Sequence, residues 1–327
     1  MPLQEGKFDT DDCFITFRNE VEGPLVSVII ASRNGKVRSL DRLMAGDLIE
    51  VIVVRGRSPG MNRNIGAIVS KAEYLAFIDD DAVMDSHTLL KCLRHFSDGN
   101  VGVVGGPNLT MENSTLWERV SGYALASPLG SSTMRWRYSA MRGIVKTDER
   151  ALTSCNLIIR RGVFFAAGGF PEKIYPAEEN VLLHRISRLG YTLIYDSEFV
   201  AYHKRRGSLI GHIVQVFRYG RGRAMMLKVC PDAFKPIFVM PSIGLITICS
   251  TLTLASIGAL SLLIPLTLLS TYLSATAFES IRTSIVNRDL RALPALMILM
   301  PLHHLAYALG FTRGLLSRKV DGRKGLG

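Results

Sequence analysis

The sequence predicts a Rossmann-like, doubly wound α/β sheet, followed by an amphipathic helix and C-terminal transmembrane helices. Three observations lead to this fold class. Short apolar runs rich in β-branched residues alternate with helical segments in the first half of the chain, as in α/β domains. A segment at 209–229 mixes apolar residues with several arginines. Two stretches without Asp, Glu, Lys or Arg, 237–278 and 292–312, fill most of the C-terminal third.

The predicted sheet begins with a buried strand at 26–31, and two further strands end directly at Arg55 and Asp79. Ligands of such sheets bind beyond the carboxyl ends of the strands, so Asn34, Arg55 and Asp79 lie where a ligand is expected. The other predicted strands are 48–54, 74–78, 101–105, 153–159, 191–195 and 199–202, and the predicted helices are 36–46, 61–72, 86–98 and 178–189.

The uncharged stretches predict membrane segments. A spanning helix needs about 20 apolar residues, so we expect two spans, at 237–257 and 259–279. A third full span at 292–312 would place the basic tail outside the cell, against the usual excess of basic residues on the cytoplasmic side. We therefore predict that 292–312 is re-entrant or interfacial. The protein is expected to be a multi-pass cell-membrane protein whose α/β domain is cytosolic.

These segments predict four parts of the chain. They are a lead-in at 1–24, an α/β domain at 25–206, an amphipathic interfacial helix region at 207–235 and a membrane domain at 236–327.

The formal net charge of +11 raises the possibility of a nucleic-acid partner. The basic residues, however, concentrate before and after the apolar stretches, where anionic lipid headgroups attract them. We therefore interpret the charge as a sign of contact with membrane lipids and predict no nucleic-acid partner. The five cysteines are scattered without a CxxC pair, so the sequence indicates neither a disulfide framework nor a zinc site.

Three consecutive carboxylates, Asp79, Asp80 and Asp81, follow the strand at 74–78. Like charges this close repel each other and raise each other's pKa unless a cation is present. Oxygen ligands suit Mg²⁺ or Mn²⁺, which proteins often hold with one or two carboxylates plus substrate phosphates. The alternative interpretation is a solvated acidic turn. The buried strand that precedes the triplet favours the metal site.

Five motifs follow one another along the chain. They are Gly60-Met-Asn-Arg-Asn-Ile-Gly66, Glu73-Tyr-Leu-Ala-Phe-Ile-Asp-Asp-Asp81, Ser154-Cys-Asn-Leu-Ile-Ile-Arg-Arg161 with Gly168-Gly-Phe170, Pro176-Ala-Glu-Glu-Asn180, and Gln215-Val-Phe-Arg218-Tyr219. In this order they resemble the family-2 glycosyltransferases, which have the GT-A fold. The resemblance covers about residues 26–223 and looks closest to bacterial and archaeal membrane enzymes of the succinoglycan-synthesis type.

The resemblance implies a role for each motif. A nucleotide-diphosphate sugar would be the donor, with Asp81 as ligand of a metal that neutralises the departing diphosphate. Asp79 would contact the ribose of the donor or assist in holding the metal. Arg63 would add positive charge near the diphosphate. Glu179 occupies the position of the family's catalytic base, with Glu178 as its substitute. Direct displacement assisted by one base implies inversion at the anomeric carbon. Ser32, Asn34, Arg55 and Asp80 complete the predicted nucleotide-sugar site.

Two parts of the sequence depart from the family pattern. Arg55 occupies the position where the family usually has an Asp that helps to recognise the nucleotide base. The identity of the nucleotide is therefore not predicted. The Glu-Asp motif is Glu-Glu here, and Val181 replaces an acid two residues further on, so acceptor recognition is open too.

The acceptor side is predicted from aromatic and basic residues, because aromatic rings stack on sugars and Arg binds phosphate. The bilayer location favours a lipid-linked acceptor, such as a polyprenyl-linked glycan. An ordinary amphipathic loop at 135–138 is the alternative, and His203 is interpreted as a surface histidine more readily than as a metal or phosphate contact. The predicted acceptor-binding residues are Arg135, Trp136, Gln215, Arg218 and Tyr219.

Two other functions remain open from the sequence. A processive polysaccharide synthase shares the Gln-x-x-Arg-aromatic motif, but its translocation channel needs more spans than this chain offers. A catalytically inactive membrane scaffold of the same fold is the second alternative, suggested by the substitutions at Arg55 and Val181.

Overall fold

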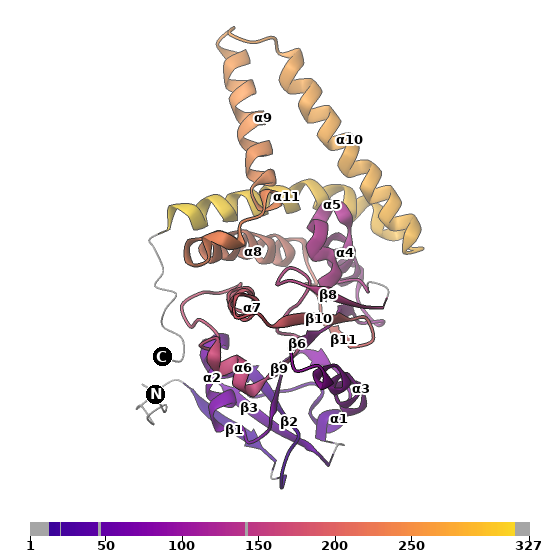
Figure 1. The fold of residues 1–327 in the computed structure, drawn as a ribbon. Coiled ribbons are helices and arrows are strands. Elements are labelled where there is room, and N and C mark those ends of the chain that lie inside the picture. The colour runs from indigo at the N-terminus through magenta and orange to yellow at the C-terminus, as the bar shows by residue number, and fades with distance from the viewer. Residues whose placement is uncertain (1–12, 20, 45–46, 141–142, 318–327) are drawn as a thin grey trace. The chain divides into compact units, whose positions relative to one another are not determined.

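Figure 1 shows the fold of the computed structural model, which describes residues 13–19, 21–44, 47–140 and 143–317. The chain divides into two compact units. Among the described residues, unit 1 comprises 13–111 and 136–204, and unit 2 comprises 112–135 and 205–317. Segment 112–135 thus groups with the C-terminal helices, although it lies within the predicted α/β domain. Most of the predicted lead-in and the basic tail lie outside the described residues.

Unit 1 is built on an eight-stranded sheet of mixed direction, in the order β1-β3-β2-β4-β9-β6-β10-β8. β2 pairs in parallel with β3 and β4, and β6 with β10, whereas β9 runs antiparallel to β4 and β6. The sheet is therefore mixed rather than purely parallel. Its strands are β1 (Phe14–Arg18), β2 (Val26–Ser32), β3 (Ile49–Arg55), β4 (Tyr74–Asp79), β6 (Val101–Gly105), β8 (Ile144–Thr147), β9 (Asn156–Arg160) and β10 (Thr192–Asp196).

Both faces of this sheet are covered, as the alternation along β2 shows. Val28 and Ile30 belong to one buried cluster and Ile29 to the other, because successive side chains of a strand point to opposite faces. Ser58 caps the helix that starts at Pro59, which suits the first turn because its missing N–H needs no partner there. The helices of unit 1 are α1 (Leu40–Met44), α2 (Pro59–Val69), α3 (Ser86–Cys92), η1 (Leu93–Ser97), α6 (Arg161–Ala166) and α7 (Glu178–Arg188).

A second, three-stranded sheet holds the residues that follow the acidic triplet. It consists of β5 (Ala82–Val83), β11 (Ala201–His203) and β7 (Asn108–Thr110). In the antiparallel pair of β11 and β5, His203 is opposite Ala82. Backbone pairing therefore brings His203 beside the end of the triplet.

Unit 2 is helical. Two of its helices, α8 (Leu209–Val229) and α11 (Leu293–Leu316), approach each other closely. A Cβ atom at Gly220 would overlap the carbonyl oxygen of Tyr307, and one at Gly310 would overlap that of Phe217. The predicted helix at 209–229 is confirmed as α8. The helices of unit 2 are α4 (Leu116–Ala126), α5 (Pro128–Ser131), α8 (Leu209–Val229), η3 (Pro231–Ala233), η4 (Pro236–Phe238), α9 (Met240–Ser256), α10 (Leu263–Val286), η5 (Leu290–Ala292) and α11 (Leu293–Leu316), while η2 (Ser132–Arg137) starts in unit 2 and ends in unit 1.

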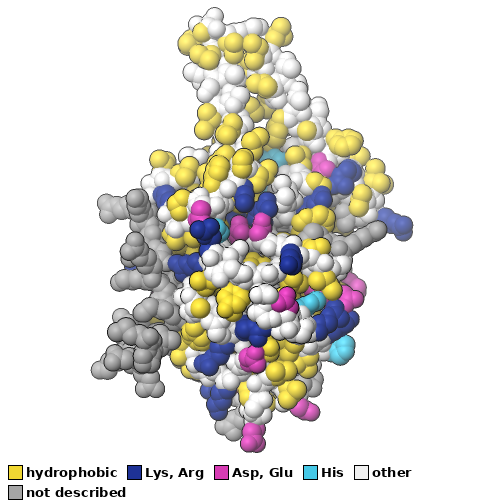
Figure 2. All heavy atoms as spheres, in the orientation of Figure 1, with side chains coloured by type: hydrophobic (Ala, Val, Ile, Leu, Met, Phe, Trp, Pro, Cys, Tyr) yellow, Lys and Arg dark blue, Asp and Glu magenta, His cyan; other side chains and the backbone are white. Residues whose placement is uncertain are grey.

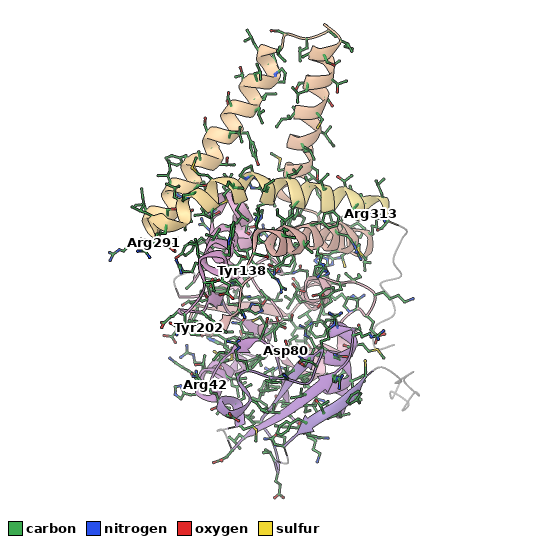
Figure 3. The ribbon with its side chains drawn as sticks, turned by 180° about the vertical axis from the view of Figure 1, so that it is seen from behind. Arg42, Asp80, Tyr138, Tyr202, Arg291 and Arg313 are labelled. Carbon is green, nitrogen blue, oxygen red and sulfur yellow. The ribbon has the colours of Figure 1, made fainter. Side chains whose placement is uncertain are left out.

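Within unit 2, α9 and α10 extend away from the pair formed by α8 and α11, whereas α11 lies alongside α8 (Figure 1). On the face seen in Figure 2, hydrophobic side chains lie along the upper parts of α9 and α10, where no charged side chain is visible. Arg291 and Arg313, labelled in Figure 3, lie near the two ends of α11. In the described part of the chain, one helical segment, Leu290–Leu316, has the length and apolar composition needed to cross a membrane, and α9 is apolar but shorter.

Candidate functional site

The acidic triplet lies at the carboxyl end of β4, and its three members have different surroundings. Ser32 Oγ donates a hydrogen bond to Asp80 Oδ2 at 2.7 Å and accepts one from the Gly35 N–H at 3.0 Å. Asn34 Oδ1 accepts from the Lys36 N–H in the same turn at 3.0 Å. Burial raises the pKa of Asp80, against the opposing effect of the Ser32 hydrogen bond. The structure thus brings together three predicted residues, with Asp80 built into a turn.

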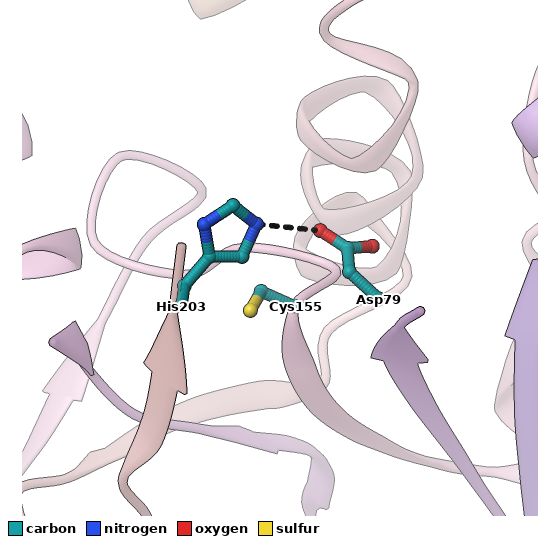
Figure 4. Close-up of side chains that lie close together, drawn as sticks. All are labelled: Asp79, Cys155 and His203. Carbon is teal, nitrogen blue, oxygen red and sulfur yellow. Dashed lines mark ion pairs between the residues drawn. The ribbon is translucent and has the colours of Figure 1, made fainter. Parts of the chain in front are cut away.

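The other two aspartates face a histidine. His203 Nε2 lies 3.0 Å from Asp81 Oδ1. It lies 3.8 Å from Asp79 Oδ2, and Figure 4 shows this second pair. Asp79, Cys155 and His203 each offer one ligand atom, and these three atoms lie within 4.8 Å of one another. Carboxylate, imidazole and thiol are all metal ligands, so the donor set at this end of β4 fits a divalent cation.

Arg63 joins the acidic triplet to the predicted catalytic base region. Its Nη2 lies 2.8 Å from Asp79 Oδ1 and its Nη1 lies 2.9 Å from Glu178 Oε1. The side chain is buried and packs on the ring of Phe170. Although burial alone would lower the pKa of Arg63, the charges of Asp79 and Glu178 raise it. One guanidinium therefore holds two parts of the predicted site that are far apart in the sequence.

The two predicted base residues, Glu178 and Glu179, begin α7 in unlike environments. Burial and the adjacent Glu179 charge raise the pKa of Glu178 to about 7, against the opposing effect of Arg63. Glu178 Oε2 is buried without a hydrogen-bond partner among the described residues. Glu179 Oε1 instead lies 3.1 Å from Arg137 Nη1, and its side chain is 12% exposed. Glu179 is thus the member of the pair that combines a cationic partner with some access to solvent.

Arg137 is itself buried and fixed by backbone carbonyls. Its Nη2 donates to the Glu149 carbonyl at 2.6 Å and its Nε to the Arg150 carbonyl at 2.7 Å. Arg137 was not among the predicted site residues, although the basic aromatic segment at 135–138 contains it, and His203 was predicted to be a surface histidine. The adjacent Trp136 could have drawn attention to Arg137. The position of His203 directly after the strand predicted at 199–202 could have drawn attention to that histidine.

The remaining predicted residues lie in several places. Arg55 is exposed at the end of β3, with its guanidinium over the Phe14 ring at 5.4 Å. Trp136 packs against the unit 1 core cluster that contains Phe77 and Phe170. The other acceptor-side residues, Arg135, Gln215, Arg218 and Tyr219, belong to unit 2.

Two of these unit 2 residues contact each other on α8. Gln215 Nε2 donates to the Tyr219 hydroxyl at 2.8 Å, one helical turn away. Their predicted roles in acceptor binding stay predictions, as do the roles of Arg55, Arg135, Trp136 and Arg218.

The sequence matches a protein-family model described as "Glycosyl transferase family 21" over residues 48–326. The match confirms the prediction of a glycosyltransferase. The matching family is family 21, whereas the sequence motifs resembled family 2.

Two curated relatives also match. An O-antigen chain rhamnosyltransferase, WbaN, of Salmonella anatum is 24% identical over 203 residues, which cover 59% of this chain and 61% of the relative. A pre-mycofactocin glycosyltransferase of Mycobacterium tuberculosis is 25% identical over 183 residues, which cover 56% of this chain and 38% of the relative. The chain thus spans about two fifths to three fifths of the length of these relatives.

The fold is similar to that of a solved structure, the mannosyltransferase PcManGT from Pyrobaculum calidifontis in complex with GDP-Man and Mn²⁺. The TM-score is 0.50 at 14% sequence identity, and the alignment covers 89% of this chain and 88% of the other. This similarity confirms the predicted glycosyltransferase fold, with its mixed α/β sheet.

Proposed function

Because the chain belongs to glycosyl transferase family 21, we propose that it is an inverting, metal-dependent enzyme that transfers a sugar from a nucleotide-diphosphate sugar to a lipid-linked acceptor. The bridge made by Arg63 carries this proposal, because it places the carboxylates suited to a metal and the carboxylates suited to a base around one guanidinium. A displacement at a sugar carbon needs a stabilised leaving group on one side and a base on the other.

The metal side of the reaction would use Asp81, Asp79 and His203, whose ligand atoms face one another at the end of β4. A bound Mg²⁺ or Mn²⁺ supplies Lewis-acid neutralisation of the diphosphate leaving group. The solved relative contains GDP-Man and Mn²⁺, and we propose a donor and a metal of the same chemical classes here. Ser32, Asn34 and Asp80 shape the turn next to this position, and Arg55 at the end of β3 would face the nucleotide.

The base of the reaction would be Glu179. Its carboxylate lies 3.1 Å from Arg137 Nη1, and its side chain keeps some access to solvent. Glu179 would take the proton of the acceptor hydroxyl as that oxygen attacks the anomeric carbon on the face opposite the departing diphosphate. The buried Glu178, whose pKa is raised to about 7, is the poorer base because it is enclosed and bound to Arg63. Glu178 and Arg63 would hold the start of α7 in place.

The acceptor side would combine a membrane anchor with a lipid-linked substrate. The exposed apolar side chains of α9 include Ile243, Ile246 and Leu252, and the start of α10 exposes Leu263 and Leu266. Apolar side chains exposed around most of a helix are typical of contact with lipid. At 17 residues, α9 is about 26 Å long by the usual helical rise, close to the hydrocarbon thickness of a bilayer. We propose that α9 and α10 form a membrane-spanning pair.

For α11 we propose a position along the membrane surface, although its composition alone would let it cross. The helix packs along α8, where Arg218 and Arg221 are exposed. If α11 crossed the bilayer, these arginines would enter the hydrocarbon region at a cost of several kcal/mol, about 3 kcal/mol each on insertion scales. The outer face of α11 is an apolar stripe at helical spacing, formed by Met297, Ile298, Leu305, Leu309 and Leu316.

Cysteine accessibility tests this topology in intact cells or oriented vesicles. Single cysteines at Ser317, after α11, and at Ala259, between α9 and α10, are introduced with Cys249 replaced by serine. We expect Ser317→Cys to react only from the cytosolic side and Ala259→Cys only from the outside. Reaction of Ser317→Cys from the outside would show that α11 crosses the membrane.

The enzymatic proposal is tested by a screen of nucleotide sugars with polyprenyl phosphate and polyprenyl diphosphate glycans as acceptors. The detergent-solubilised chain should release nucleoside diphosphate and form one sugar–acceptor linkage in the presence of Mn²⁺. Glu179→Gln should lower kcat by about 10²- to 10⁴-fold while donor affinity stays unchanged, because only proton transfer is lost. Glu112→Gln, at an exposed glutamate of unit 2, is the matched control.

The same assay separates the alternatives. Products with many added sugars would indicate a processive synthase. A chain that binds no donor and forms no product in the whole screen would indicate an inactive scaffold. Full activity in Glu179→Gln would contradict the proposed base.

A further inference from the structure

The metal position contains a sulfur atom. Cys155 is 2% exposed, and its thiol belongs to the group with Asp79 and His203 whose ligand atoms all lie within 4.8 Å of one another. Figure 4 shows the three side chains gathered at the ends of neighbouring strands. A site intended for Mg²⁺ has only oxygen ligands, as a rule. The presence of imidazole and thiol here therefore changes which metal the site suits.

The backbone holds these three residues firmly. Cys155 directly precedes β9, and in the pairing of β4 with β9 the neighbouring Asn156 is opposite Ile78, one residue before Asp79. The Cys155 N–H also donates to Thr153 Oγ1 at 3.0 Å. His203 is placed by the pairing of β11 with β5. Two separate strand pairings thus bring the three ligand atoms together without a flexible loop.

The carboxylate of Asp79 is divided between two tasks. Its Oδ1 lies 2.8 Å from Arg63 Nη2, while its Oδ2 faces His203 Nε2 at 3.8 Å. The ion pair with Arg63 fixes the orientation of the carboxylate, so that the second oxygen remains directed toward the imidazole and the thiol. A metal site can select between metal ions only when the side chains that coordinate the ion are held in a fixed orientation.

We propose that Asp79, Cys155 and His203 form a mixed oxygen–sulfur–nitrogen metal site that selects transition-metal ions such as Co²⁺ or Zn²⁺ over Mg²⁺. This inference rests on the metal dependence in the proposed function and names the metal class of that same site. Thiolate and imidazole ligands favour these ions, whereas Mg²⁺ prefers carboxylate and water oxygens. Asp81, at 3.0 Å from His203, and the donor diphosphate are available for the remaining positions. Because the thiolate is the ligand, metal binding releases the Cys155 proton to the solvent.

The test is cobalt spectroscopy on the full-length, detergent-solubilised chain after treatment with a chelator. Co²⁺ should produce a near-ultraviolet sulfur-to-metal charge-transfer band that saturates at one ion per chain. Cys155→Ser should remove this band and weaken Co²⁺ binding by about tenfold or more, while Mg²⁺ binding changes little. His203→Ala should weaken Co²⁺ binding, but the charge-transfer band should still appear at high Co²⁺ concentration because the sulfur ligand is retained.

Cys92→Ser is the matched control, because Cys92 is equally buried in the same core cluster but lies outside the group of possible metal ligands found among the described residues. It should keep the band. Persistence of the band in Cys155→Ser, absence of the band in the unmodified chain, or equal affinity for Mg²⁺ and Co²⁺ would each overturn the inference. Circular dichroism and thermal unfolding of Cys155→Ser serve as the folding control. If both are unchanged, loss of the band reflects the loss of the sulfur ligand.

The outcome for the metal is distinguishable from the outcome for the proposed function. A cobalt–sulfur band in a chain that transfers no sugar would support the mixed site and contradict the enzyme proposal. Sugar transfer supported equally by Mg²⁺, with no sulfur band, would support the enzyme and overturn the mixed site.

Discussion

The centres of the two units stabilise their polar groups in different ways. In unit 1, the buried Arg63 pairs with the partly buried Asp79 and the buried Glu178. In unit 2, the buried histidines of α8 and α11 make neutral hydrogen bonds. Ser121 Oγ lies 2.8 Å from His212 Nδ1, and His212 Nε2 lies 3.0 Å from His303 Nδ1. A chain of this kind is satisfied when each ring carries a single proton.

The difference agrees with the roles proposed for the two units. The proposed site for a diphosphate and a metal needs fixed charges, which must be paired with each other before the ligands arrive. Helices with the proposed membrane location have no such need, and an unpaired charge there is costly. Within unit 2, α8 and α11 pack by close backbone approach, as at Gly220 and Gly310, and by neutral hydrogen bonds, while the buried Glu279 of α10 is paired with Arg282.

The largest expected effect tests the charge side of this comparison. Arg63→Met should lower the free energy of unfolding by about 3–5 kcal/mol, because it leaves the carboxylates of Asp79 and Glu178 without their buried partner. Thermal and denaturant unfolding in detergent measure the loss. The same substitution at exposed Arg57 is the control and should change stability little. A loss below about 1 kcal/mol in Arg63→Met would mean that the bridge is not a net support of unit 1.

The next effect tests the packing side. Gly310→Ala should destabilise the chain by about 3 kcal/mol, because the new Cβ would overlap the Phe217 carbonyl and backbone atoms cannot rotate away. Gly244→Ala, within α9, is the matched control because its Cβ meets no atom within 4 Å. We expect the control to be neutral or slightly stabilising, since alanine favours helix more than glycine does. Equal stability of the two variants would show that α8 and α11 are less tightly joined than the structure indicates.

Much of the fold could be predicted from the sequence because the central strands are buried on both faces. The run at 26–31 became β2 (Val26–Ser32), and the strand before the triplet became β4 (Tyr74–Asp79). Strand β1 was not predicted, because most of its side chains are exposed and it forms by pairing with β3, which is distant in sequence. Of the helix predicted at 36–46, residues 36–39 are not helical and Leu40–Met44 forms α1, while 45–46 lie outside the described residues.

The candidate site was predictable where its residues are neighbours in the sequence and not where they meet through folding. The triplet and the Glu178–Glu179 pair were visible as motifs, but no local pattern indicates that Arg63 bonds Glu178 across 115 positions. The contact of His203 with Asp81 depends on the pairing of β11 with β5 in the same way. Such contacts are set by strand order, which periodicity does not specify.

The smallest expected effect is a difference in the sign of the pH dependence of the two units. Burial lowers the pKa of His212 from 6.5 to about 4. The unfolded chain therefore binds more protons between these values, so the His212 contribution to stability is complete above pH 6.5 and is lost as the pH falls toward 4. The pKa of Glu178 is raised from 4.5 to about 7, so its contribution is complete below pH 4.5 and is lost as the pH rises through 7.

Substitutions at the two residues should separate these signs. His212→Gln should lower stability by about 1–2 kcal/mol at neutral pH, because one of two hydrogen bonds is lost, and should flatten the loss of stability in acid. Glu178→Gln should instead flatten the decline between pH 4.5 and 7. Thermal unfolding midpoints measured across this pH range, with exposed His87→Gln as the control, give both slopes. If His212→Gln leaves the acid slope unchanged, the histidines of unit 2 are not held in their neutral form by burial, and the contrast between the units is one of packing alone.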